Sequence, residues 1–314
     1  MAPPKPIRAA FFGSPEFAVP CLEALHRVAD VAAVFSQPDR PKGRGLKLTP
    51  PAVKQRALEL GLPVFQPKKV RDGRLAAQLR ELRLDVAVVV AYGRILPKDV
   101  LDAPRKGCVN VHASILPRWR GAAPIQWSIA SGDSHAGVSL MAMDEGMDTG
   151  AVYAVAKRSI EAKDTAGTLS VELAAMGAEL LKAKLEDVVH HSLPAVPQPD
   201  DGVTHARMLT KEDARIDWTR SASAIDAHRR GMTPWPGCFT TRGDERVKIH
   251  DAAPTRAPSA GAPGEVLELD ERGLLVNCGE GVLALKVLQP AGRKRLDAQS
   301  YVAGYGMPER FGAF

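Results

Sequence analysis

The stretch DVAVVVAYG (residues 85–93) is a continuous apolar run of strand length, followed by a second one, GCVNVHAS (107–114). Earlier apolar runs are IRAAFFG (7–13), VAAVFS (31–36) and LPVFQP (62–67). They alternate with segments whose apolar residues recur at helical spacing, namely SPEFAVPCLEALHRVAD (14–30), PPAVKQRALELG (50–61) and GRLAAQLRELR (73–83). Such alternation is typical of a parallel sheet covered on both faces. We predict an α/β fold with a doubly wound, mostly parallel, Rossmann-like sheet, and Ser14 as the N-cap of its first helix.

The texture of the chain changes after a predicted long helix over 168–190. SLPAVPQPDDGVTHA (192–206) is rich in proline and polar residues and is interpreted as a linker. A short helix around 221–231 and five short apolar runs follow, separated by Gly, Asp and Asn turns, as in a small antiparallel barrel. These runs are GCFTTR (237–242), RVKIHDA (246–252), GEVLELD (264–270), GLLVNCG (273–279) and GVLALKVLQP (281–290). We predict a first domain over 1–190, a linker over 191–206 and a C-terminal OB-like β-barrel over 207–314.

Composition excludes several classes of protein. The 314 residues are 45% hydrophobic and 25% charged, as in soluble globular proteins of two domains. The longest apolar run, VAVVVAY (86–92), is far short of a membrane span. The chain enters its first strand too early for a signal peptide. Four widely spaced cysteines without a CxxC pair indicate reduced thiols in the cytoplasm and no structural zinc. The net charge of +6 allows an anionic partner without requiring one.

The common cofactor motifs of this fold class are missing from the sequence. There is no GxxxxGK[ST] phosphate loop and no GxSxG elbow, and FFGSPEF (11–17) has one glycine where a dinucleotide fingerprint needs three. The sequence therefore favours an α/β enzyme that uses neither NAD nor a phosphate-binding loop.

Polar residues at every second position mark a candidate site. Asn110, His112 and Ser114 should share one face of their strand. An amide can donate to a developing oxyanion, and an imidazole can relay protons. The segment MDEGMDTG (143–150) follows a strand-like run, and we expect it at the same carboxyl edge of the sheet. It offers Asp144, Glu145 and Asp148 as partners for the imidazole, and spacing does not choose among them. Transfer at a carbonyl carbon fits this set, although satisfied core and turn groups would give the same pattern.

Longer motifs resemble a known family. NVHASILPRWRGAAPIQW (110–127) and MDTG (147–150) resemble the signatures of folate-dependent formyltransferases. The resemblance extends over most of the chain to the members of that family that act on methionyl-tRNA. The further motifs are FFGSPEFA (11–18), FSQPDRPKGRGLKLTPPAVK (35–54), LPVFQP (62–67), VVVAYGRILP (88–97), ARIDW (214–218), PWPG (234–237) and LQPAGRKR (288–295).

The resemblance implies a role for individual residues. The catalytic residues of the family fall on Asn110, His112 and Asp148. Its folate pocket falls on Ser114, Ile115, Leu116, Pro117 and, more loosely, Val90, Tyr92 and Gly93. Contacts to tRNA are expected at two basic clusters: Arg40, Lys42, Arg44 and Lys47 in a glycine-containing loop, and Arg293, Lys294 and Arg295 in the predicted barrel. Trp119 and Arg120 either meet the substrate or lock the turn into the following helix.

The implied activity is transfer of the formyl group of 10-formyltetrahydrofolate to the α-amine of initiator methionyl-tRNA, for translation initiation. It needs no metal, and nothing in the sequence demands more than a monomer. The alternatives are a formyltransferase for a small amine, such as a ribonucleotide or amino-sugar nucleotide, a formyl-folate hydrolase, and an RNA-binding protein with a vestigial site.

Overall fold

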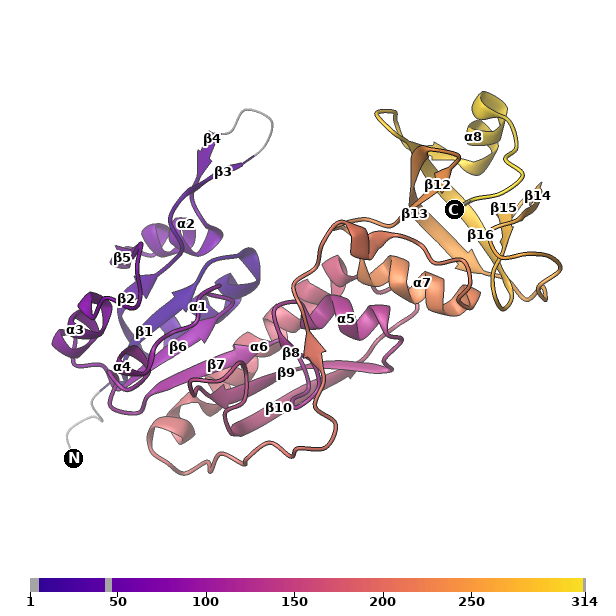
Figure 1. Cartoon of the computed structure of the whole chain (residues 1–314). Helices are drawn as coiled ribbons and strands as arrows, with labels where there is room; N and C mark the ends of the chain where they lie inside the picture. The colour runs from indigo at the N-terminus through magenta and orange to yellow at the C-terminus, as the bar shows by residue number, and fades with distance from the viewer. Residues whose placement is uncertain (1–5, 43–46, 313–314) are drawn as a thin grey trace. The chain divides into compact units, whose positions relative to one another are not determined.

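The computed structural model describes residues 6–42 and 47–312, with only the backbone of Lys42. The chain forms two compact units (Figure 1). One consists of residues 1–124, 135–159 and 170–206, and the other of residues 125–134, 160–169 and 207–314. No helix in the described part of the chain is long and apolar enough to cross a membrane.

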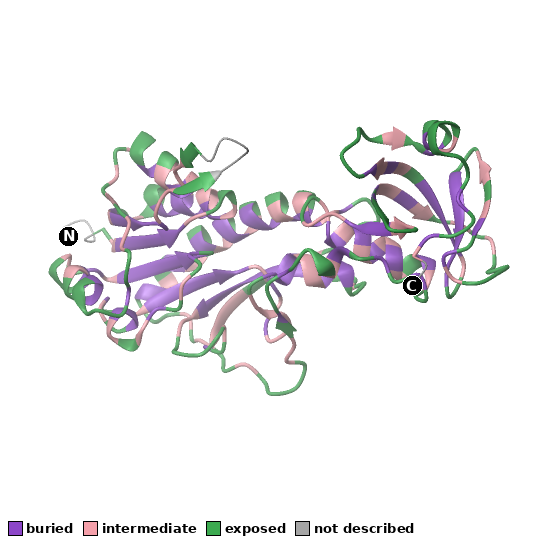
Figure 2. Ribbon diagram, turned by 45° about the horizontal axis from the view of Figure 1, so that its top comes forward, coloured by how far each residue is buried: buried purple, intermediate pink, exposed green. Residues whose placement is uncertain are grey.

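A seven-stranded sheet forms the centre of the first unit (Figure 1). In spatial order its strands are β10 (Val152–Ser159), β9 (His135–Ala142), β7 (Cys108–His112), β6 (Val86–Val90), β1 (Arg8–Gly13), β2 (Asp30–Phe35) and β5 (Val64–Phe65). The strands from β7 to β5 are parallel. The central strands β6 and β7 are buried along their whole length (Figure 2), as expected for a sheet covered on both faces. The predicted mostly parallel, doubly wound sheet is confirmed.

Helices cover this sheet. They are α1 (Val19–Val28), α2 (Ala52–Glu59), α3 (Arg74–Glu81), α4 (Lys98–Leu101) and the long α6 (Ala166–Val189), with one 3-10 turn, η1 (Glu16–Ala18), before α1. On one face, Leu79 of α3 and Val100 of α4 join a buried cluster that includes Phe12 and Cys108. On the other face, Val111 of β7 lies against Gly177 of α6.

The side chains of β7 therefore alternate between two different environments. Cys108 belongs to the cluster under α3 and α4, whereas Val111 meets α6. Because successive residues of a strand point to opposite faces, Asn110 and His112 lie on the Cys108 face. The predicted one-sided polar face of this strand is confirmed.

The direction of β9 corrects one expectation. This strand runs antiparallel to β7, with Val109 paired to Ala142 and His112 paired to Ser139. The segment 143–150 therefore leaves β9 beside the amino end of β7, where the Met143 N–H donates to the Cys108 carbonyl at 2.9 Å. The prediction that this segment starts at the carboxyl edge was wrong, because a run of apolar residues does not encode the direction of a strand.

Ser14 is not a helix cap. Its hydroxyl accepts from the Gln37 N–H at 3.1 Å and lies 3.4 Å from the Tyr92 carbonyl oxygen. The chain enters α1 through η1, which has no side-chain cap. The Ser14 hydroxyl instead connects the segments that follow β2 and β6, so the predicted N-cap is corrected.

An antiparallel half-barrel forms the core of the second unit, as predicted. Its strands are β12 (Phe239–Arg242), β13 (Glu245–Pro254), β16 (Val282–Pro290), β15 (Gly273–Asn277) and β14 (Val266–Asp270), in that order, with β17 (Leu296–Asp297) beside β16. Its helices are α5 (Pro124–Ala130), η2 (Glu212–Ala214), α7 (Ala222–Gly231) and α8 (Ala298–Tyr305). Ser221 caps α7 and Asp297 caps α8 through N–H groups at 3.2 and 2.7 Å.

Gly177 provides a test of the packing between α6 and the sheet. A Cβ at this position would lie 2.8 Å from Val111 Cγ1 and 3.4 Å from Val138 Cγ1. Gly177→Val should lower the free energy of unfolding by about 1–3 kcal/mol, because overpacking outweighs the gain in helix propensity of a few tenths of a kcal/mol. Urea unfolding followed by circular dichroism measures this loss. Gly304→Val on α8, where a Cβ meets nothing within 4 Å, is the control. Equal losses in both variants would contradict the assigned packing.

Candidate active site

Asn110, His112 and Asp148 lie together although they come from two separate segments. The Asn110 side-chain amide donates to Asp148 Oδ1 at 3.2 Å, and His112 Nδ1 lies 3.6 Å from Asp148 Oδ2. The three side chains are largely buried, with 9%, 7% and 17% of their surface exposed for Asn110, His112 and the Asp148 side chain. A buried carboxylate needs donors around it, and here both neighbours on β7 can supply them.

Both ring nitrogens of His112 have polar neighbours. Nε2 lies 2.9 Å from the carbonyl oxygen of Trp119, while Nδ1 faces Asp148. Because a carbonyl oxygen only accepts, Nε2 carries a hydrogen in this arrangement. A second proton on Nδ1 would then place an imidazolium directly beside the Asp148 carboxylate.

The backbone around Asp148 is held in an uncommon conformation. Asp148 has a φ of +55°, which is rare for a residue with a side chain. Its Oδ2 accepts from the Gly121 N–H at 2.9 Å. The two other acidic candidates are placed differently: Asp144 accepts from the Thr149 hydroxyl at 2.7 Å, and Glu145 is exposed. The structure thus brings Asp148 to the Asn110–His112 pair.

The segment Ser114–Pro117 directly follows β7. The Ser114 hydroxyl donates to the Arg118 carbonyl at 2.7 Å, and the Ser139 hydroxyl donates to the Ser114 carbonyl at 2.7 Å. The Leu116 N–H donates to the same Ser139 hydroxyl at 3.1 Å. Ser114 is therefore occupied as a turn-forming group, and Ser139, in the middle of an apolar run, was not predicted to take part.

The second predicted folate segment lies next to the first. Val89 of β6 is paired with Asn110 of β7, so the residues after both strands emerge side by side. Val90 is fully buried, and the ring of Tyr92 packs edge-on against Phe12 with 5.2 Å between the centroids. Gly93 is exposed and has a φ of +80°. Burial raises the pKa of the Tyr92 phenol.

The first basic cluster lies on a short hairpin, β3 (Arg40–Lys42) and β4 (Lys47–Thr49). Arg40 and Lys47 are exposed. Arg44 and the two glycines beside it lie outside the described residues. The base of the hairpin is anchored by Asp39, which accepts from Lys54 Nζ at 2.8 Å and from the Gln66 amide at 2.8 Å. The Lys54 hydrogen bond, followed by that of Gln66, lowers the pKa of the Asp39 carboxyl.

The second basic cluster belongs to the other compact unit. Arg293, Lys294 and Arg295 are exposed in the turn between β16 and β17. The turn is braced by the Gln289 side chain, whose amide donates to the Arg293 carbonyl at 2.7 Å and whose oxygen lies 2.7 Å from His250 Nε2.

Residues 191–206, interpreted from the sequence as a linker, are attached to the first unit along much of their length. We call them the strap segment. Val196 forms an antiparallel bridge with Val152, and β11 (His205–Ala206) pairs with β8 (Arg120–Gly121). The Trp119 N–H also donates to the Thr204 hydroxyl at 2.9 Å. Trp119 and Arg120 thus help to lock this turn, one of the two roles considered for them.

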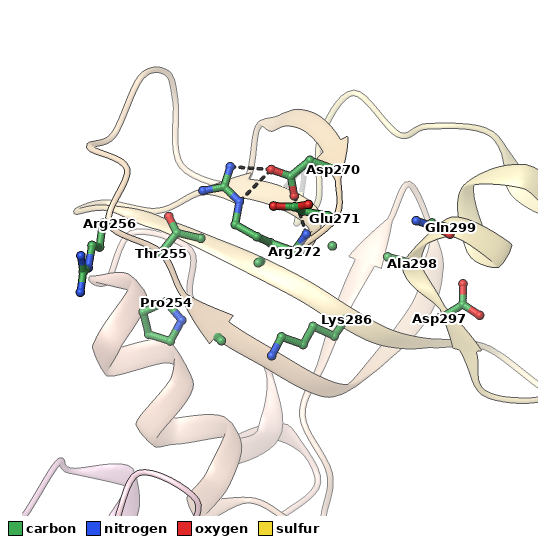
Figure 3. Close-up of a pocket in the computed structure, with 13 residues that line it drawn as sticks. Pro254, Thr255, Arg256, Asp270, Glu271, Arg272, Lys286, Asp297, Ala298 and Gln299 are labelled. Carbon is green, nitrogen blue, oxygen red and sulfur yellow. Dashed lines mark hydrogen bonds and ion pairs between the residues drawn. The ribbon is translucent and has the colours of Figure 1, made fainter.

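A separate concavity of about 810 Å³ lies in the second unit (Figure 3). It is lined by residues 253–256, 270–273, 284, 286 and 297–299, none of which belongs to the predicted site. The lining mixes charges of both signs, and Arg272 points at Asp270 with an Nε–Oδ2 distance of 2.7 Å. The polar cluster around Asp148 remains the better candidate for chemistry.

Nucleophilic catalysis by a thiol does not fit this chain. All four cysteines are free and buried. Burial raises the pKa of the thiols of Cys21, Cys108 and Cys238 to about 12, which keeps them protonated near neutral pH. The geometry instead offers an amide donor, an imidazole and a carboxylate, a set suited to stabilising charge at a carbonyl carbon and moving a proton.

Two family models match the chain. Residues 7–185 match the model described as "Formyl transferase", and residues 208–306 match "Formyl transferase, C-terminal domain". The methionyl-tRNA formyltransferase of Sorangium cellulosum is 51% identical over 300 residues, which are 95% of this chain and 96% of that protein. The enzyme of the same name from Myxococcus xanthus is 49% identical over 298 residues, 95% of each chain.

Solved structures share the fold at much lower identity. The N-formyltransferase of Helicobacter canadensis, solved with folinic acid and dTDP-3-aminofucose, aligns with a TM-score of 0.69 at 17% identity over 89% of this chain and 99% of that one. HypX of Aquifex aeolicus, solved with tetrahydrofolic acid, aligns with a TM-score of 0.60 at 16% identity over 95% of this chain and 47% of that one. On the family models and the near full-length relatives together, the chain belongs to the formyl transferase family, within its group of methionyl-tRNA formyltransferases.

Proposed function

We propose that this protein transfers the formyl group of 10-formyltetrahydrofolate to the α-amine of initiator methionyl-tRNA in the cytoplasm. The identity of 51% over 95% of the chain to an enzyme of that name carries the proposal. The buried polar cluster of Asn110, His112 and Asp148 supports it, because such a cluster can act on a formyl carbon.

The residues around the cluster fit a formyl-folate. After one amide hydrogen of Asn110 is given to Asp148, the second is left for a carbonyl oxygen. The paired strands β6 and β7 end side by side, which brings the segments 90–93 and 114–117 to one place. When bound, the formyl-folate supplies an N-formyl group whose carbonyl carbon is the electrophile.

Asn110 stabilises the oxygen of that carbonyl in the proposed mechanism. A new bond from the α-amine nitrogen to the formyl carbon places negative charge on the oxygen. The free N–H of Asn110 donates to it, and Asp148 holds the amide in that orientation through its 3.2 Å hydrogen bond. The bond to the folate N10 then breaks, and the amine loses one proton as N10 gains one.

His112 and Asp148 move this proton and balance the charge. With Nε2 held by the Trp119 carbonyl, Nδ1 is the nitrogen that gains and loses a proton, and it faces the Asp148 carboxylate at 3.6 Å. A protonated Nδ1 puts positive charge near the developing oxyanion, and Asp148 stabilises that charge. A carboxylate beside an imidazole plays this orienting part in other acyl-transfer sites.

Substitutions in the cluster test these roles. Asn110→Ala should lower turnover about 10²–10³-fold, the usual loss for one oxyanion donor. His112→Ala and Asp148→Asn should each lower it about 10²–10⁴-fold, because general acid–base help is lost. Turnover is measured with saturating substrates, and thermal unfolding checks the fold. Glu145→Gln, an exposed carboxylate of the same loop, is the control. A folded variant with wild-type turnover would remove its residue from the mechanism.

The exposed cations of the β3–β4 hairpin are proposed to contact the phosphates of the tRNA, as are Arg293, Lys294 and Arg295. A hairpin with an anchored base can hold its charges without a large loss of entropy on binding. Arg40 and Lys47 both lie on it and are exposed.

The double variant Arg40→Ala/Lys47→Ala should raise the KM for methionyl-tRNA and leave the KM for formyl-folate unchanged. The slope of log KM against log salt should fall by about one to two, since each lost phosphate contact releases fewer counterions. Arg80→Ala, an exposed arginine on α3, is the matched control. A parallel rise in the KM for folate would assign the hairpin to the folate site.

A small amine is the alternative acceptor, because a structural neighbour was solved with an amino-sugar nucleotide. Purified protein with formyl-folate is offered methionyl-tRNA, free methionine or an amino-sugar nucleotide, and the formylated product is detected by mass. We expect formylation of methionyl-tRNA above the other two. Preference for a small amine would overturn the proposal.

A further inference from the structure

Gln198, in the middle of the strap segment, makes four hydrogen bonds around Asp148. Its amide nitrogen donates to the carbonyl oxygens of Asp148 and Gly150, both at 2.8 Å. Its amide oxygen accepts from Nε and Nη2 of Arg120 at 3.0 and 2.8 Å. A single side chain thereby connects the backbone on both sides of Thr149 to strand β8.

The orientation of this amide is determined by its partners. A guanidinium only donates and a carbonyl oxygen only accepts, so Arg120 must face the amide oxygen and the two carbonyls must face the nitrogen. No other side chain of this length offers one acceptor and two donors in this way. Glutamate would keep the Arg120 contact but set a carboxylate oxygen against two carbonyl oxygens.

The strap segment holds Gln198 in place from both sides. Before it, Val196 exchanges two backbone hydrogen bonds of 2.8 Å with Val152. After it, the Thr204 carbonyl accepts from the Arg120 N–H at 2.9 Å. Gln198 itself stands between Pro197 and Pro199, which restrict the local backbone and present no N–H groups that need partners.

We propose that Gln198 is a positioning residue, which holds the Asp148 backbone so that its carboxylate faces Asn110 and His112. Asp148 has a left-handed φ of +55°, which an L-residue adopts when its surroundings impose it. The carbonyl of Asp148 and that of Gly150 are both tied to Gln198, and the Asp148 carboxylate is on the same residue. The link to catalysis rests on the function proposed above.

The variants Gln198→Ala and Gln198→Glu test this role. Both should lower kcat about 10- to 100-fold with little change in either KM, because a misplaced catalytic group costs turnover and not binding. Gln198→Glu is the sharper variant, since it keeps an acceptor for Arg120 and removes the two donors. Gln55→Ala, an exposed glutamine on α2 whose amide donates to a carbonyl, is the matched control. Wild-type kcat in both folded Gln198 variants would overturn the proposal.

A double-mutant cycle separates positioning from a general structural role. If Gln198 acts through Asp148, adding Gln198→Glu to Asp148→Ala should cause no further loss of kcat. A full multiplicative loss would overturn the proposal.

Hydrogen–deuterium exchange tests the same role without activity. Gln198→Glu should speed exchange in the peptide that covers residues 144–152, whereas Gln55→Ala should not. Unchanged exchange there overturns the positioning role. A wild-type protein that fails to formylate methionyl-tRNA overturns the proposed function instead, so the two failures are distinguishable.

Discussion

The carboxylate of Asp148 is the charge around which the first unit is organised. It is mostly buried, and an ionised carboxylate out of water is costly unless donors surround it. The donors come from distant parts of the chain: the Asn110 amide on β7 and the Gly121 N–H on β8, with His112 Nδ1 close by. Gly121 has a φ of +119°, and a Cβ on it would lie 2.7 Å from the Ala206 carbonyl oxygen. Glycine at this position therefore lets β8 approach both the carboxylate and the strap segment.

The reversal of β9 explains how Asp148 reaches the middle of β7. A parallel β9 would deliver the segment 143–150 to the edge where Ser114 emerges. Because β9 runs the other way, this segment starts beside Cys108 and returns toward β10, and the Asp148 side chain meets Asn110 and His112 on the way. The carboxyl-edge rule of parallel sheets thus applies to the segments after β6 and β7 but not to the one that carries the acid.

Different parts of the structure were predictable from the sequence for different reasons. Hydrophobic periodicity identified the strands, the long helix and the half-barrel, and alternation placed Asn110 and His112 on one face. The direction of β9 depends on pairing that periodicity does not record. The choice of Asp148 over Asp144 and Glu145 came from resemblance, since all three stand in one turn-rich segment. Gln198 escaped notice because proline-rich polar segments are typical of linkers, and its partners lie about 50 and 78 residues away in sequence.

The chemical site and the selection of the acceptor depend on different parts of the chain. A protein solved with an amino-sugar nucleotide shares this fold at 17% identity, so the fold by itself does not specify the amine. Selection must then depend on surfaces outside the buried cluster, and the hairpin of β3 and β4 is one such surface. Its anchor, Asp39, is tied to Lys54 of α2 and to Gln66 after β5. Gln66 also donates to the Gln37 carbonyl at 2.8 Å, so the hairpin base is joined to the end of β2. The hairpin is thus supported by the same sheet that carries Asn110 and His112, which couples the position of its charges to the position of the catalytic strand.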